Sequence, residues 1–179
     1  MVVDSIRVNT QNYQRVLILK EKSADRSIPI WIGSSEAEAI TLKIQGVTRP
    51  RPLSHDLIFS IISALTASID YVILTNLKGE TFFAKIVLNA GGKAIEVDSR
   101  PTDAIALAVK AGVPIYAEET LLDESGLVLD PETGRPLDGL EQAEGANKKI
   151  VSEDELKRLS AFKDFIDKTD LEDFGKGKK

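Results

Sequence analysis

The sequence has no cysteine and only one histidine in 179 residues. Without cysteine, the chain forms no disulfide bond, holds no thiolate-bound metal and has no cysteine nucleophile. A single histidine excludes an acid–base pair or a metal site built from several histidines of one chain. Carboxylates and arginines are therefore the main groups available for chemistry.

Long apolar runs and an excess of basic residues are also missing. No stretch approaches the roughly 20 apolar residues of a membrane span, and the N-terminus lacks the basic flank and apolar run of a secretory signal. We therefore expect a soluble, cytoplasmic protein with no membrane partner. The formal charge of −5 excludes a broadly basic surface for nonspecific nucleic-acid binding.

The negative charge lies entirely in the last third of the chain. Residues 1–122 hold 13 basic and 13 acidic residues, whereas residues 123–179 hold 10 and 15. This asymmetry predicts separate functional parts. We expect a domain over 1–122, an acidic linker or arm over 123–150, and a C-terminal part over 151–179 with an amphipathic helix at 152–165 and a basic end.

The pattern of apolar residues predicts an α+β fold with a mixed, mainly antiparallel sheet. Segments rich in β-branched residues predict short strands at 2–8, 15–20, 28–32 and 113–117. Alternation between turns predicts a three-stranded antiparallel meander at 71–78, 81–88 and 93–98. Helical spacing predicts three packed helices, the first capped by Ser35, the second capped by Ser54 and the third over 101–111.

Polar residues concentrate at the starts of the three predicted helices. Unpaired backbone N–H groups and the helix dipole make such starts favourable for anions, including phosphate. The first junction contains Glu36. The second contains Arg49, Arg51, His55 and Asp56, and the third contains Asp98, Arg100, Thr102 and Asp103.

These junctions have a functional and a structural interpretation. In the functional one, carboxylates hold Mg²⁺ or Mn²⁺ and support hydrolysis of a phosphodiester, while arginines bind phosphate. The metal ligands would then be Asp98, Asp103 and Glu36, the catalytic groups Asp98, Asp103, His55 and Asp56, and the phosphate-binding groups Arg49, Arg51, Arg100 and Thr102. In the structural one, the acids stabilise helix dipoles, the serines cap helices and the arginines pair with the acids.

Four blocks of the sequence resemble the bifunctional nuclease domain family in order and spacing. They are IPIWIGSSEAEAI, GVTRPRPLSHDLI, TFFAKIVL and IEVDSRPTDAIALAVKAGVPIY, within about residues 1–122. The family pattern EIDARPSDAIA is kept at Glu96, Asp98, Arg100 and Asp103, with departures at Val97, Ser99 and Thr102. Ser54 replaces the usual Thr before His-Asp, and SAFKDFIDKTDLEDF resembles a segment that follows the domain in bacterial members.

The resemblance implies an α+β domain with DNase and RNase activity. Our first hypothesis is a nuclease that hydrolyses phosphodiester bonds of DNA or RNA with the help of Mg²⁺ or Mn²⁺. The alternative is a non-catalytic binding or assembly module in which the Asp and Arg residues form structural ion pairs. The wide apolar stripes also predict a homo-oligomer, most simply a dimer.

Overall fold

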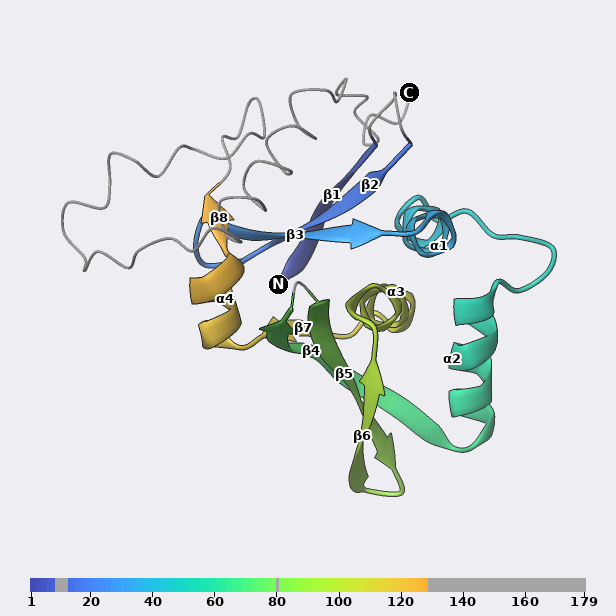
Figure 1. The fold of residues 1–179 in the computed structure, drawn as a ribbon. Coiled ribbons are helices and arrows are strands. Elements are labelled where there is room, and N and C mark those ends of the chain that lie inside the picture. The colour runs from blue at the N-terminus through green and yellow to red at the C-terminus, as the bar shows by residue number, and fades with distance from the viewer. Residues whose placement is uncertain (9–12, 80, 129–179) are drawn as a thin grey trace, which may run out of the picture.

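The computed structural model describes residues 1–8, 13–79 and 81–128, and Figure 1 shows their arrangement. These residues form strands and helices in mixed order, which confirms the α+β class. The elements are β1 (Val2–Val8), β2 (Arg15–Lys20), β3 (Arg26–Ile32), α1 (Ser34–Ile44), α2 (Ser54–Ala64), β4 (Ala67–Lys78), β5 (Thr81–Ala90), β6 (Lys93–Ser99), α3 (Pro101–Ala111), β7 (Ile115–Ala117), α4 (Glu119–Ser125) and β8 (Leu127–Val128).

The strands divide between two four-stranded sheets. The first has the order β1-β2-β3-β8, and all its neighbours are antiparallel. The second has the order β6-β5-β4-β7, in which the predicted meander is extended by β7, parallel to β4. The strands at 2–8 and 15–20 and the meander were predicted, whereas the division into two sheets was not.

Regular secondary structure extends beyond residue 122. We expected a linker from residue 123, but α4 continues to Ser125 and β8 pairs with the start of β3. The turn-forming and acidic residues of this stretch did not predict the short helix α4, whose Leu121 and Leu122 are buried. The predicted helix at 152–165 lies outside the described residues.

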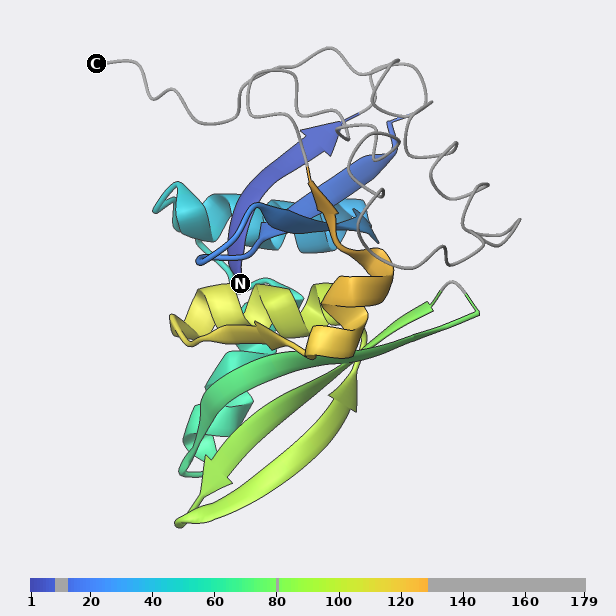
Figure 2. The same ribbon diagram turned by 90° about the vertical axis from the view of Figure 1, so that its left-hand side faces the viewer.

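Helix α3 lies at the centre of the molecule. Figure 2 shows it between the first sheet with α1 on one side and the second sheet on the other. Its residues 104–108 are all buried, as expected for a helix that is apolar nearly all round. Because α3 packs against α1, α2, β4 and β5, its N-terminus is placed beside the first turns of α1 and α2.

Two predicted caps are wrong by one or two residues. Helix α1 is capped by Gly33 rather than Ser35, and α2 by Leu53 rather than Ser54. At α2, the carboxylate of Asp56 accepts the Leu53 N–H at 2.9 Å, so the acid at the third helical position reaches back to the N-cap residue. At α1, a Cβ on Gly33 would lie 2.5 Å from the Glu36 carboxylate, so this carboxylate needs a glycine at the cap.

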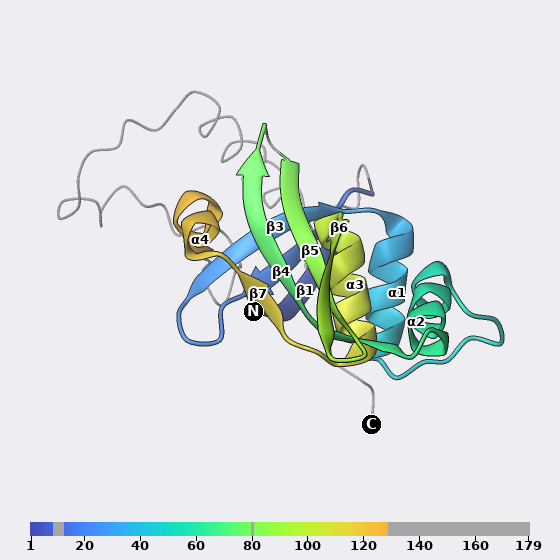
Figure 3. The same cartoon turned by 90° about the horizontal axis from the view of Figure 1, so that it is seen from below.

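The apolar stripe of α2 is largely exposed. On helix α2, the side chains of His55, Phe59 and Ile62 turn inward. Those of Leu57, Ile58 and Ile61 face solvent. Figure 3 shows α2 at the edge of the molecule, beside α1 and on the side opposite α4. No helix within the described ranges is long and apolar enough to cross a membrane.

Candidate functional site

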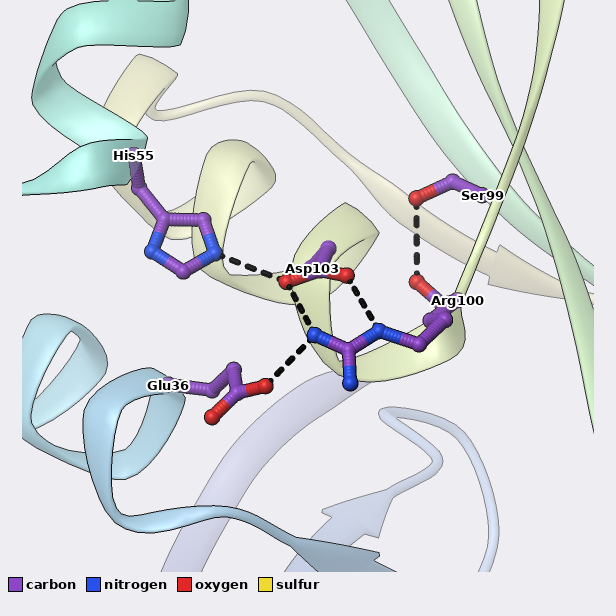
Figure 4. Close-up of polar contacts among 5 residues, drawn as sticks. All are labelled: Glu36, His55, Ser99, Arg100 and Asp103. Atoms are coloured by element: carbon purple, nitrogen blue, oxygen red, sulfur yellow. Dashed lines mark hydrogen bonds and ion pairs between the residues drawn. The ribbon is translucent and has the colours of Figure 1, made fainter.

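Four charged or titratable side chains meet at the N-terminus of α3. Figure 4 shows Glu36 from α1, His55 from α2, and Arg100 and Asp103 from the start of α3. Arg100 is the N-cap residue and Pro101 begins the helix, which suits the fixed backbone angle of proline. We call Glu36, His55, Arg100 and Asp103 the α3 network.

Arg100 links the two carboxylates of the network. Its Nε and Nη2 atoms donate to Asp103 at 2.7 and 3.1 Å, and Nη2 also donates to Glu36 at 2.6 Å. The hydrogen bonds from Arg100 to Asp103 and the charge of Asp103, followed by the hydrogen bond to Glu36, raise the pKa of the guanidinium. The Arg100 side chain is nevertheless 69% exposed. Its Nη1 atom points away from both carboxylates in Figure 4 and has no hydrogen-bond partner among the described residues.

Asp103 connects Arg100 to His55. Burial raises the pKa of Asp103, but hydrogen bonds from Arg100 and His55, with their charges, outweigh burial and lower this pKa. Asp103 is therefore ionised at neutral pH and only accepts hydrogen bonds. Because the Nε2 atom of His55 lies 3.0 Å from Asp103 Oδ1, Nε2 must carry a proton. In neutral His55 the unshared electron pair then lies on Nδ1.

His55 is 7% exposed, and its Nδ1 atom faces away from Asp103 (Figure 4). No buried side-chain nitrogen or oxygen in the described part lacks a hydrogen-bond partner. Because Asp103 is the only side-chain hydrogen-bond partner of His55 among the described residues, Nδ1 keeps a small contact with solvent. The ring is thus fixed on one side by a carboxylate and accessible on the other.

Asp56 lies outside the network although it follows His55. Its carboxylate receives the Leu53 N–H and lies 2.6 Å from the ammonium group of Lys110. The hydrogen bond from Lys110 and then the one from Leu53 lower the pKa of Asp56. Asp56 therefore acts as a helix cap and a tie between α2 and α3. We did not predict Lys110, because a lysine in the last turn of a helix is normal for the helix dipole alone.

Asp98 also lies apart from the network. Strand alternation places it on the same sheet face as its neighbour Lys85, whereas Ser99 is on the face of the buried Ala84. The helices cover this second face, since α3 packs against β5. Asp98 and Asp103 are therefore close in sequence but point to opposite sides of the second sheet.

The other predicted phosphate-binding residues are spread out. Arg49 pairs with Glu38 at 2.6 Å, Arg51 is exposed in the segment before α2, and Thr102 is buried in α3. The structure therefore brings together Glu36 of the first junction, His55 of the second, and Arg100 and Asp103 of the third. Sequence reasoning missed Gly33, whose missing side chain leaves room for the Glu36 carboxylate.

The donor set does not fit a preformed divalent-metal site. No group of three or more His, Cys, Asp or Glu residues within the described residues is arranged to hold a metal ion. Of the three predicted ligands, Glu36 and Asp103 already bind the guanidinium of Arg100, and Asp98 points elsewhere. We therefore derive no step that involves a metal ion.

Comparisons with known proteins identify related chains. The sequence profile of the Bifunctional nuclease domain matches residues 17–130, which include all four network residues. An uncharacterized protein of Mycobacterium tuberculosis is 42% identical over 172 residues, 96% of this chain and 95% of the relative. Bifunctional nuclease 1 of rice (Oryza sativa subsp. japonica) is 21% identical over 126 residues, 68% of this chain and 38% of the relative.

Proposed function

The chain belongs to the bifunctional nuclease domain family, and from this membership and the α3 network we propose that it hydrolyses phosphodiester bonds of DNA or RNA. The observation that carries the proposal is the fixed His55–Asp103 pair beside the exposed guanidinium of Arg100. It supplies a base with a defined tautomer and a positive group within one cluster. The name of the rice relatives supports the same activity.

In the proposed mechanism, Arg100 binds the phosphate through Nη1. Its contacts with Asp103 and Glu36 orient the guanidinium before the substrate arrives, so little side-chain entropy is lost on binding. His55 Nδ1 accepts a proton from the attacking water while the water oxygen bonds to phosphorus. The P–O bond to the leaving group then breaks, and the leaving oxygen takes a proton from solvent.

The charge of the network favours this sequence of events. Two carboxylates face one guanidinium, so the net charge is −1 when His55 is neutral and zero when His55 is protonated. Proton transfer from water therefore removes negative charge from the site as the phosphate gains it, which stabilises the transition state. Assistance by Mg²⁺ or Mn²⁺ stays a separate prediction, because the donor set does not fit a preformed metal site.

The experiment compares the purified full chain with His55→Gln. The glutamine amide can donate to Asp103 as His55 Nε2 does, but it supplies no base at the position of Nδ1. We expect cleavage of single- and double-stranded DNA and RNA by the parent, a loss of at least about 100-fold in the variant, and nearly unchanged thermal stability. Asp98→Asn is the matched control and should keep the activity.

Cleavage is measured with Mg²⁺, with Mn²⁺ and with a chelator. Full activity in His55→Gln would refute the assigned base, and equal activity in every variant would identify a contaminating nuclease. No cleavage of any substrate by the parent under all three conditions would refute the nuclease proposal itself.

A specific observation supports the non-catalytic assembly module as a second candidate. Glu36, Arg100, Asp103 and His55 are joined by hydrogen bonds that tie three helices together. Such a network holds a fold without performing any chemistry. Two results together would favour this candidate: the parent cleaves no substrate, and His55→Ala strongly lowers thermal stability.

A further inference from the structure

The outer face of α2 is apolar, exposed and free of charge. Leu57, Ile58, Ile61 and Leu65 expose 53, 41, 49 and 71% of their surface. The other exposed residues of this helix are serine or alanine. Its two titratable residues face inward, His55 toward Asp103 and Asp56 toward Lys110. We call the surface of Leu57, Ile58, Ile61 and Leu65 the α2 face.

The α2 face is large enough to matter energetically. Its four residues expose about as much surface as two whole aliphatic residues, on the order of 400 Å². Ile44 and Val47, at the end of α1 and just after it, expose a further 60 and 49%. The four residues of the α2 face alone amount to about half of the roughly 800 Å² that each partner contributes to a standard interface, so they would form its apolar core.

The α2 face offers no charged group to a charged partner. A nucleic-acid backbone requires Lys or Arg to neutralise phosphates, and helices that lie on membranes usually carry basic residues on their polar face. The described chain ends at Val128 beside β3, on the side of the molecule away from α2 (Figures 1 and 3). An uncharged aliphatic face of this kind is complementary to itself.

We propose that the α2 face binds the α2 face of a second copy of this chain. Ile61 lies at the centre, because Leu57 and Leu65 stand one turn before and one turn after it on the same ridge. The two helices cross near Ile61 on a two-fold axis, so each ridge packs beside its copy and no charge is buried. This proposal does not depend on nuclease activity.

The first test measures the mass of the full-length chain by sedimentation equilibrium at micromolar concentrations. We expect twice the chain mass for the parent. In Ile61→Glu, two like charges would meet at the axis, so we expect the dissociation constant to rise at least about 100-fold. Val2→Glu, at an exposed aliphatic residue of β1, is the control and should leave the dimer intact.

The second test uses the absence of native cysteine. Under mild oxidation, Ile61→Cys should form a disulfide-linked dimer, because residues at a two-fold axis face their own copies. Ser63→Cys is also exposed but lies about 200° around the helix from Ile61, so it should remain monomeric on a non-reducing gel. This test does not require the glutamate variant to fold.

Three results would overturn the proposal. The first is a monomeric parent, which would point to residues 129–179 as the cover of the α2 face. The second is a dimer that Ile61→Glu leaves unchanged. The third is equal cross-linking of Ile61→Cys and Ser63→Cys.

Discussion

Replacing Asp103 with asparagine tests whether the α3 network stabilises the fold. The change keeps the size of the side chain but removes the charge that accepts three hydrogen bonds from Arg100 and His55. The Asp103 side chain is only 25% exposed, so solvent replaces these bonds poorly.

The expected loss follows from the burial of each partner. Arg100 is largely exposed, so its ion pair with Asp103 contributes only about 0.5–1 kcal/mol. His55 is buried, and leaving its N–H without a charged acceptor costs about 1–2 kcal/mol. We therefore expect Asp103→Asn to lower the free energy of unfolding by about 2 kcal/mol at pH 7.

The loss depends on pH with a defined sign. The fold lowers the pKa of Asp103, so the stabilisation is complete above the pKa of the unfolded state, about 3.9. It disappears as the pH falls through the lower pKa of the folded state. The contribution of the Asp103 charge to stability should thus shrink progressively below about pH 4.

Urea denaturation followed by circular dichroism measures the difference in stability between parent and variant at each pH. Asp98→Asn is the control, because Asp98 is exposed on the opposite face of the sheet, and it should change stability by less than about 0.5 kcal/mol. A loss below about 0.5 kcal/mol in Asp103→Asn at pH 7, or an equal loss at pH 7 and pH 3, would refute the reasoning.

Two further predictions concern the starts of α1 and α2. In Gly33→Ala the new Cβ displaces the Glu36 carboxylate from Arg100. Because that carboxylate ends a flexible side chain, we expect the free energy of unfolding to fall by less than about 1 kcal/mol. A crystal structure of the variant should show the broken contact. Asp56→Asn removes the charged partner of Lys110 and weakens the α2 cap, so thermal melting should show a loss of about 1 kcal/mol. The lowered pKa of Asp56 places this loss above about pH 4 and removes it in stronger acid.

The sequence predicted those parts of the fold that depend on near neighbours. The meander was predictable because Phe82, Ala84, Ile86 and Leu88 alternate along one strand, and the turn at 89–92 follows directly. The caps were misplaced because several residues at a helix start are acceptable caps, and the residue type alone does not select among them. The N-caps are Gly33, beside the Glu36 carboxylate, and Leu53, whose N–H is accepted by Asp56.

The candidate site was predictable in its residue types but not in its pairs. His55 contacts a residue 48 positions away, and Glu36 contacts one 64 positions away, so no local pattern encodes either distance. Asp98 and Asp103 seemed a natural pair because they are close in sequence, but the pleat of β6 separates them. Periodicity likewise revealed the apolar side of α2 without showing that this side lies on the surface.

The central position of α3 has a consequence for synthesis on the ribosome. The buried side chains of β2, β3 and α1 belong to the same core as those of α3, but α3 begins about 60 residues after α1 ends. While the chain emerges from the exit tunnel, β1, β2, β3 and α1 therefore keep an exposed apolar surface until Pro101–Ala111 is released. A nascent chain stalled before that point presents this surface to chaperones and to other nascent chains, and release of a single late helix hides it from both.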